Sequence, residues 1–375
     1  MKRFQEEHIL NDLRKKMVFL CGPRQVGKTW LAKKIAASYS NPQYLNYDRL
    51  EDREIIRREG WPAKTDLLLL DEIHKMPGWK NYIKGIYDTR EDDLHILVTG
   101  SARLEMLRQV GDSLAGRYFR HRLLPFSLSE LAQTKQVEYL DIERLIKRGG
   151  FPEPFIADDP VDSHRWRMQY IDGLIRSDVL DFERIHDFRA IQIVLELLRR
   201  RVGSPVSYMS IAEDAQIAPA TVKKYIEIFE GLYIVFRVTP WSRNIARSLL
   251  KEPKIYFYDT AMVEGDEGAH FENLIACSLL KHVCALIDYK AQKWRLHYLR
   301  TRDGQEVDFC LVRDDRAELM IEAKYSFRDV PRSLIKFNRT YSIPAMVVAQ
   351  NLKREQEIEN ISICKAQKYL SQLFL

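Results

Sequence analysis

The sequence predicts an α/β protein with a parallel sheet in its N-terminal part and a second α/β domain at its C-terminal end. Three observations support this fold class. Short apolar runs alternate with helical stretches over residues 1–130, three helical segments precede a β-rich run within 190–250, and strand-like segments follow a helix within 251–375. Apolar runs separated by helices are typical of a parallel sheet covered on both faces.

The first part of the chain contains four candidate strands. The run Met17–Cys21 is apolar and ends at Gly22-Pro23, which is typical of a buried strand. A helical stretch extends from Lys28 to about Tyr39. The remaining candidate strands are 43–47, 67–70 and 95–99.

The middle of the chain is predominantly helical. Residues 131–189 are charged, and a turn cluster at 149–154 lies near a boundary between two parts. Three helices and a β-rich run follow: 191–201, 210–215, a helix from Pro219 onward, and 232–238. This is the element order of a winged helix-turn-helix.

The C-terminal part predicts strands flanked by helices. The expected elements are helix 271–285, strands 295–300, 306–312, 319–324 and 344–349, and a closing helix 366–375. The polar turn 313–316 joins the second and third of these strands. We therefore expect four parts: a nucleotide-binding core (1–130), a lid-like helical extension (131–189), a winged helix-turn-helix (190–250) and a C-terminal α/β domain (251–375).

Composition excludes several classes of protein. The chain is 46% hydrophobic and 30% charged, with 16 glycines and 14 prolines, so it is neither collagen-like nor of low complexity. The five cysteines are odd in number and no two are spaced C-x-x-C, which indicates reduced thiols. The N-terminus lacks the apolar segment of a signal peptide, and we find no membrane span. We expect a cytoplasmic protein without a membrane partner.

One octapeptide carries a phosphate-binding pattern. Its residues match G-x-x-x-x-G-K-[ST] between a strand and a helix: Gly22, Pro23, Arg24, Gln25, Val26, Gly27, Lys28 and Thr29. The glycines let backbone N–H groups surround the phosphates. Lys28 can reach the terminal phosphates, and the Thr29 hydroxyl can ligate Mg²⁺.

Two acids follow the third candidate strand. Asp71 and Glu72 come directly after the run 67–70 and lie 43 residues beyond Lys28, on what we expect to be a strand neighbouring the first. Asp71 would hold Mg²⁺, and Glu72 would orient and deprotonate the attacking water. Such an arrangement is typical of a Walker B element.

Two further residues have alternative roles. Ser101, or less favourably Thr99, follows the fourth strand and would sense the γ-phosphate, although Ser101 serves equally well as the cap of the next helix. Arg117, in Leu-Ala-Gly-Arg, is a candidate arginine finger acting on another subunit, against the commoner solvated arginine.

These motifs resemble a known family. The segments Gly-Pro-Arg-Gln-Val-Gly-Lys-Thr, Leu-Asp-Glu-Ile-His-Lys-Met-Pro-Gly-Trp, Thr-Gly-Ser and Leu-Ala-Gly-Arg resemble AAA-type ATP-binding proteins of bacteria and archaea. In that family a poorly characterised C-terminal domain follows the ATPase. The resemblance implies a P-loop NTPase core of the AAA+ type. It supports Lys28, Thr29, Asp71, Glu72 and Ser101 in their usual roles, and Arg117 as a finger.

The helical unit has two interpretations. The third helix exposes Thr221, Lys223 and Lys224, and the two lysines can contact phosphates. Glu227 and Glu230 oppose them, and small helical subdomains of this order also serve only for packing. With a net charge of +6, a nucleic-acid partner, preferably DNA, is compatible with the chain.

A third set of charged residues lies in the C-terminal part. Asp308, Glu322 and Lys324 fall where a hairpin would bring them together, and Glu272 lies on the preceding helix. The three carboxylates could hold Mg²⁺, which would activate water, with the lysine assisting. This pattern resembles restriction-endonuclease-like nucleases of the PD-(D/E)xK type, with Val-Asp in place of Pro-Asp. The alternative is a pair of solvated strands with salt-bridged side chains.

Two functional hypotheses follow. In the first, the protein binds and hydrolyses ATP with Mg²⁺ and acts on nucleic acid, and nucleotide state controls cutting by the nuclease-like domain. In the second, it is an ATP-driven signalling or scaffolding switch, or a DNA-binding regulator, whose C-terminal domain binds without cutting. The arginine finger suggests a homo-oligomer in either case.

Overall fold

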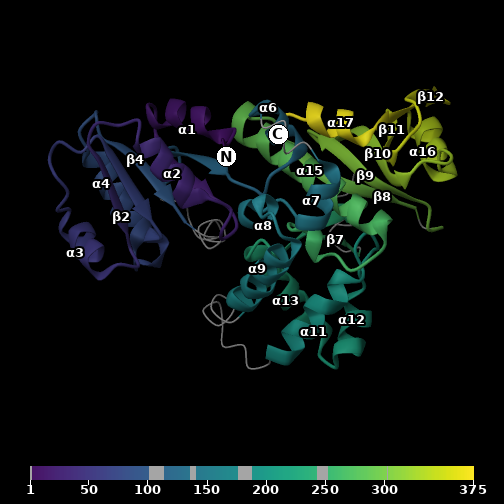
Figure 1. The fold of residues 1–375 in the computed structure, drawn as a ribbon, viewed down its shortest axis with the longest axis horizontal. Coiled ribbons are helices and arrows are strands. Elements are labelled where there is room, and N and C mark those ends of the chain that lie inside the picture. The colour runs from purple at the N-terminus through teal and green to yellow at the C-terminus, as the bar shows by residue number, and fades with distance from the viewer. Residues whose placement is uncertain (1, 101–113, 136–140, 176–187, 243–251, 302) are drawn as a thin grey trace. The chain divides into compact units, whose positions relative to one another are not determined.

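The computed structural model describes residues 2–375 except 101–113, 136–140, 176–187, 243–251 and 302 (Figure 1). Ser101 therefore lies outside the described residues. The chain forms two compact units, and each is described by itself. The first contains residues 1–124 and Gly231–Tyr233, and the second contains 125–230 and 234–375.

The first unit is built on a parallel sheet, as the sequence predicts, but the sheet has five strands where four were expected. Its strands are β1 (Met17–Cys21), β2 (Pro42–Asn46), β3 (Leu67–Asp71), β4 (His95–Thr99) and β5 (Tyr118–Arg122). The order across the sheet is β2-β3-β4-β1-β5. Every residue of β1 and β3 is buried, which explains their unbroken apolar runs. Sequence analysis missed β5 because its Tyr-Phe-Arg-His-Arg sequence contains no apolar run.

The expected neighbour relation of β1 and β3 is wrong. Strand β4 lies between them and pairs in parallel with both. Thr99, the last residue of β4, is in register with Leu20 of β1 and with Asp71 of β3. The carboxyl ends of the three strands therefore meet at one edge of the sheet, where ligands bind in such folds.

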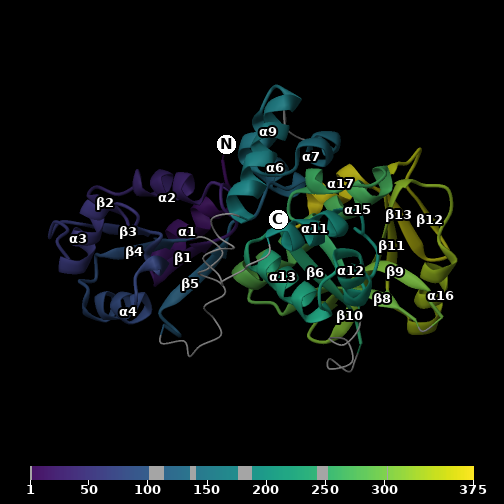
Figure 2. The same cartoon turned by 90° about the horizontal axis from the view of Figure 1, so that it is seen from below.

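Helices lie on both sides of this sheet. They are α1 (Gln5–Leu13), α2 (Lys28–Ala36), α3 (Leu50–Arg58) and α4 (Trp79–Thr89), with a short 3₁₀ turn at Ile73–Lys75. Figure 2 shows α2 and α4 on opposite sides of the strands. The α4 residues Trp79, Ile83 and Ile86 are buried in the same apolar cluster as Phe19 and Leu70. This burial fixes the sheet edge that carries the candidate site.

The second unit contains an eight-stranded mixed sheet of order β12-β13-β11-β10-β9-β8-β6-β7. The strands are β6 (Val235–Pro240), β7 (Lys254–Phe257), β8 (Trp294–Arg300), β9 (Glu306–Arg313), β10 (Arg316–Ser326), β11 (Ala345–Asn351), β12 (Gln356–Ile358) and β13 (Ile361–Lys365). The predicted polar turn joins β9 to β10, and Asp314 and Asp315 adopt φ of 45° and 64°. Two positive φ values at the centre of a hairpin match the strand twist.

Eleven described α-helices and 3₁₀ turns complete the second unit. They are α6 (Leu128–Gln133), α7 (Ile142–Arg148), α8 (Pro152–Ile156), α9 (Pro160–Gly173), α11 (Phe188–Arg199), α12 (Tyr208–Ala215), α13 (Pro219–Gly231), η5 (Thr260–Met262), α15 (Glu267–Lys290), α16 (Arg332–Tyr341) and α17 (Ala366–Gln372). Helices α11, α12 and α13 precede β6 in the predicted order. Strands β6 and β7 pair in one antiparallel ladder on either side of residue 250, and the four-part division of the chain remains our proposal.

Helix α15 is long and apolar enough to cross a membrane, which our sequence analysis did not anticipate. Of its most apolar window, 61% is buried within the structure, where the helix packs on β7, β8 and β10. A buried core helix passes the same length and composition test, so the helix is weak evidence for a membrane span. The five cysteines, one of which lies on its buried side at Cys284, form no disulfide.

A buried ion pair ties α15 to α6. The Lys281 ammonium is 3% exposed and donates to the Glu130 carboxylate, which is fully buried, and to the Pro125 carbonyl oxygen at 2.8 Å. A buried charge of this kind is tolerated because its partner and a carbonyl satisfy it.

Removing one member of this pair should destabilise the protein strongly. In Lys281→Met the Glu130 carboxylate stays buried and loses the Lys281 cation, so we expect a loss of about 3–5 kcal/mol in the free energy of unfolding, measured in urea. The double variant Lys281→Met/Glu130→Leu should lose clearly less, because no buried charge remains. Lys353→Met, at an exposed position, serves as the control. Equal losses in the single and double variants would contradict this assignment.

Candidate functional site

The loop between β1 and α2 has a conformation that its glycines allow. Gly22 adopts φ of 150°, and a Cβ on it would lie 2.1 Å from the Leu123 carbonyl oxygen, so no larger residue fits without movement. Gly27 adopts φ of 96° directly before α2, and nothing lies within 4 Å of its Cβ position. The loop is thus packed at its start and open where α2 begins. The N-terminus of a helix favours anions, so the open side of the loop faces a position that suits one.

A buried arginine that sequence analysis missed braces this loop. Arg3 is 2% exposed and donates to the Val26 carbonyl oxygen at 3.1 Å and to the Leu124 carbonyl oxygen at 2.5 Å. Arg3 therefore connects the loop between β1 and α2 to the segment that follows β5. No local signal in the sequence identifies it, because both partners are backbone atoms more than 20 residues away.

The Lys28 ammonium lies inside the loop. It is 8% exposed and donates to the carbonyl oxygens of Gly22 at 3.0 Å and Pro23 at 2.5 Å. Burial lowers the pKa of Lys28 to about 8, an effect that the negative charges of Glu72 and Asp71 partly oppose. A bound anion would add to that opposition and favour the charged ammonium.

Three hydroxyl groups converge on the Asp71 carboxylate at the end of β3. Thr29 donates to Oδ2 at 3.0 Å, Tyr44 donates to the same oxygen at 2.9 Å, and Thr99 donates to Oδ1. The pairing of Thr29 with Asp71 brings together the two residues of this unit for which the sequence predicts Mg²⁺ ligation. Tyr44 was missed, although its place on β2 beside β3 follows from the sheet order.

Glu72 directly follows Asp71 and turns away from the strand. Its φ is 55°, and its N–H donates to the Thr99 carbonyl oxygen at 3.0 Å, which fixes the backbone at the sheet edge. Its carboxylate lies 3.6 Å from both the His74 and the Lys75 side chains. Burial raises the pKa of Glu72, and the Lys75 charge partly opposes the shift. A raised pKa makes a carboxylate a better base near neutral pH.

Arg117 lies at the amino ends of the strands, opposite the carboxyl ends where the loop and the acids lie. It directly precedes β5, whose first residue Tyr118 is in register with Met17, the first residue of β1. Its guanidinium contacts Asp88 with two hydrogen bonds of 2.7 and 3.0 Å. With β1 between them, Arg117 is about 15 Å from the loop of its own chain, as the rise per strand residue requires.

A second group of charged residues surrounds Lys254 in the second unit. The side chain of this lysine is fully buried, and its ammonium lies 2.8 Å from Glu306, 3.2 Å from Glu272 and 3.3 Å from Asp308. The Tyr256 hydroxyl donates to Glu272 at 2.7 Å. We call Lys254, Glu272, Glu306, Asp308, Glu322 and Lys324 the carboxylate–lysine cluster.

The hairpin brings Asp308, Glu322 and Lys324 together in this cluster. Lys324 donates to Glu322 Oε1 at 2.8 Å, and Asp308 Oδ2 accepts a bond of 3.0 Å from the Ala323 N–H. Glu322 Oε2 is buried and has no hydrogen-bond partner. Burial, together with the charge of Asp308, raises the pKa values of Glu272 and Glu322 to about 7.

The cluster differs from the expected Mg²⁺ site. Within the described ranges, no group of three His, Cys, Asp or Glu side chains is arranged to hold a metal ion. Three of the carboxylates instead surround the Lys254 ammonium, which supplies the positive charge that a metal would supply. Sequence analysis missed Lys254, Tyr256 and Glu306. Alternation along β7 places Lys254 and Tyr256 on one face, but nothing in the local sequence pairs that face with β9.

Three family models match consecutive parts of the chain. Residues 14–132 match one described as "AAA domain", residues 139–265 match "Domain of unknown function (DUF8612)", and residues 267–369 match "Domain of unknown function (DUF4143)". The first part of the chain is thus similar to an AAA domain, and the two parts that follow match families described only as domains of unknown function.

Relatives occur in bacteria and archaea. "Uncharacterized protein Mb2031c" of Mycobacterium bovis is 25% identical over 78% of this chain and 66% of its own length, so the chain spans about two thirds of that relative. "Uncharacterized protein MJ1544" of Methanocaldococcus jannaschii is 23% identical over 82% of this chain and 74% of its own length.

The solved structures that match this chain have low TM-scores and low sequence identities. Aeropyrum pernix ORC1 in complex with DNA has a TM-score of 0.36 at 14% identity, covering 75% of this chain and 94% of that one. The Thermotoga maritima RuvB branch migration motor has a TM-score of 0.33 at 17% identity, covering 62% of this chain and 87% of that one. At these values the similarity identifies no ligand or activity for this chain.

The raised pKa values in the cluster predict a pH-dependent stability. The pKa values of the Glu272 and Glu322 carboxyl groups are about 7 in the folded protein, against an ordinary pKa of 4.5. Between these two pH values the folded protein holds protons that the unfolded chain releases. The free energy of unfolding should therefore fall as pH rises from about 4.5 to about 7 and level off above, by about 1–3 kcal/mol for each carboxyl.

Urea unfolding between pH 4.5 and 8 measures this effect. Glu322→Gln should remove roughly half of the decline, because its amide does not ionise. Glu318→Gln changes an exposed carboxyl on the same strand and should leave the decline intact. A pH profile of Glu322→Gln identical to that of the wild type would contradict the buried, proton-holding state of Glu322.

Proposed function

We propose that this protein binds and hydrolyses ATP and uses the nucleotide to control an action on nucleic acid. The observation that carries the ATPase proposal is the edge of the first sheet. There a glycine loop with a buried lysine lies at the end of β1, and the Thr29–Asp71 pair and the Glu72 carboxylate lie at the end of β3, with β4 between the two strands. The matched AAA domain supports nucleotide binding in general.

The loop residues suit a triphosphate. The phosphates would be held by the backbone N–H groups of Gly22 to Thr29 and by the start of α2. Lys28 would turn from the loop carbonyl oxygens to the terminal phosphates. The Thr29 hydroxyl and the Asp71 carboxylate are hard oxygen ligands 3.0 Å apart, so this pair fits Mg²⁺. Bound there, Mg²⁺ would neutralise charge on the phosphates.

Glu72 is the base of the proposed reaction. Its buried carboxylate would orient the attacking water and accept a proton from it, and its raised pKa suits that role. Thr99 and Tyr44 are positioning residues that hold Asp71. Ser101 remains the proposed sensor of the γ-phosphate. Arg117, far from the loop of its own chain, would complete the site of another copy, which makes a homo-oligomer part of the proposal.

The helical unit supports nucleic acid as the partner, with DNA preferred. The order of helices α11 to α13 followed by the antiparallel β6 and β7 is the order expected of a winged helix-turn-helix, which supports this proposal. On α13, Lys223 and Lys224 are exposed, and Glu227 lies 3.9 Å from Lys223. Free thiols at all five cysteines support a cytoplasmic location as part of this proposal.

The carboxylate–lysine cluster favours the second hypothesis for the C-terminal region, binding without cutting. The Lys254 ammonium already pairs with Glu272 and Asp308, two of the three carboxylates that a metal-dependent nuclease would need for its ion. The donor set therefore does not fit Mg²⁺, and no hydrolytic step follows from it. The C-terminal region would bind a partner, and ATP turnover in the first unit would switch this region between its states.

Substitutions at the loop test the ATPase proposal. Lys28→Ala should abolish ATP binding and turnover, whereas Glu72→Gln should keep binding and lose turnover by about 100-fold or more, because only the proton transfer is removed. Nucleotide binding by fluorescence titration and phosphate release measure the two effects. Lys64→Ala, at an exposed position of the same unit, is the control. Full turnover in Lys28→Ala would refute the proposal.

A nuclease assay decides between the two C-terminal hypotheses. We expect no cleavage of plasmid, linear DNA, single-stranded DNA or RNA with Mg²⁺ or Mn²⁺, with or without ATP. Asp308→Asn should leave ATP turnover unchanged. Cleavage by the wild type that disappears in Asp308→Asn would overturn the binding proposal and restore the nuclease.

A further inference from the structure

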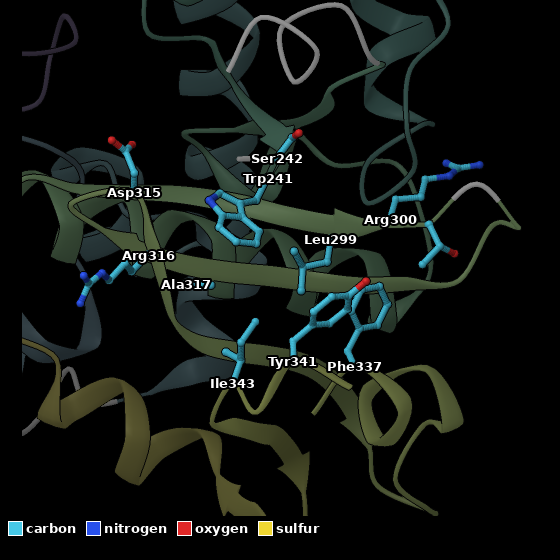
Figure 3. A pocket seen from close by; sticks show the side chains of 11 residues that line it. Trp241, Ser242, Leu299, Arg300, Asp315, Arg316, Ala317, Phe337, Tyr341 and Ile343 are labelled. Carbon is cyan, nitrogen blue, oxygen red and sulfur yellow. The ribbon is translucent and has the colours of Figure 1, made fainter. Parts of the chain in front are cut away.

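A pocket of about 1000 Å³ lies on the second unit, and one of its lining residues, Arg300, contacts Glu306 of the carboxylate–lysine cluster. Strands β8 and β10 form its floor, α16 forms one side, and the residues after β6 form the other. Figure 3 shows the Trp241 ring on one side of Leu299 and the Phe337 and Tyr341 rings on the other. Its volume is at the upper end of the range for sites that hold organic ligands.

The pocket combines a buried apolar floor with exposed aromatic edges. Leu299, Phe337 and Ile343 are each less than 8% exposed, so the floor is fixed by the core beneath it. Tyr341, in contrast, is 58% exposed, and its ring centroid lies 5.8 Å from that of Phe337. A large exposed aromatic beside a preformed hollow is typical of a binding surface.

The rim of the pocket is positively charged. Arg300 and Arg316 stand at opposite ends, and Figure 3 shows both guanidinium groups pointing outward. The one acid of the rim, Asp315, is paired at 3.0 Å with Arg295, which lies outside the pocket. Arg300 is 3.5 Å from Glu306, and no ion pair of Arg316 is found among the residues that the structure describes.

We propose that this pocket binds unpaired bases of a single-stranded nucleic acid. A base would stack on the Trp241 and Tyr341 rings, and Arg300 and Arg316 would contact the phosphates on either side. Aromatic faces between basic residues are how proteins hold single strands without reading their sequence. A duplex keeps its bases stacked inside the helix, so these rings would not reach them. The inference rests on the nucleic-acid partner proposed above and names its form.

Binding of a fluorescein-labelled oligo(dT) of 12 nucleotides to the full chain tests this pocket. Tyr341→Ala should weaken binding roughly 5- to 100-fold, the loss of one stacked base, while Tyr341→Phe keeps the ring and should bind as the wild type does. Tyr341 is exposed, so the alanine variant is expected to fold, and an unchanged circular dichroism spectrum checks this. Trp241→Phe should lose most of the tryptophan quenching that the oligonucleotide causes.

Salt dependence tests the arginines separately. Arg316→Ala should reduce the slope of log affinity against log salt by about 0.7, the value for one lost phosphate contact on a single strand. Arg354→Ala, an exposed arginine outside the pocket, should leave the slope unchanged. Equal slopes for the two variants would show that Arg316 makes no phosphate contact.

The outcomes separate this inference from the proposed function. If the wild type binds oligo(dT) and Tyr341→Ala binds equally well, the pocket proposal fails while the nucleic-acid partner stands. If the wild type binds neither oligo(dT) nor duplex DNA, the proposed partner fails as well. If thymidine monophosphate competes as strongly as the oligonucleotide, the pocket takes a free nucleotide and the single-strand proposal is overturned.

Discussion

The parallel pairing of β4 with both β1 and β3 is the constraint on which the candidate ATP site depends. This register aligns Thr99 with Leu20 on one side and with Asp71 on the other. The loop after β1 and the acids after β3 therefore lie at one edge, two strands apart. Hydroxyl groups from α2, β2 and β4 then hold the Asp71 carboxylate in place. Shifting β4 by one residue would turn Thr99 to the other face and remove its contact with Asp71.

Buried charge is handled differently in the two units. At the sheet edge of the first unit, Lys28 donates to neutral carbonyl oxygens and burial lowers its pKa, so a bound anion would stabilise its charged form. In the second unit, several carboxylates surround Lys254, and these raise its pKa. The first lysine can leave its partners for a ligand, whereas removal of the second would take away a cation that three carboxylates share. This contrast explains why we place the chemistry in the first unit and binding in the second.

The predicted elements were most accurate where a segment carries its own signal. The apolar strands β1 and β4 match the expected bounds, and the loop from Gly22 to Thr29 lies between a strand and a helix as its pattern requires. The predictions failed where the partner is distant. Arg3 contacts backbone atoms 23 and 121 residues away, and Lys254 contacts Asp308 across 54 residues. The neighbour relation of β1 and β3 was wrong for the same reason, since strand order is not encoded in any one strand.

The sequence by itself determined the α/β class, the glycine loop between β1 and α2 and the acids that follow β3, because periodicity and motif spacing are local properties of the chain. Tertiary structure alone decided that β4 separates β1 from β3, that Arg117 lies at the amino ends of the strands, and that Lys254 occupies the centre of the carboxylates. These features depend on which strands become neighbours. Burial of apolar surface across the whole unit decides which strands become neighbours, and no short segment of the sequence contains that information.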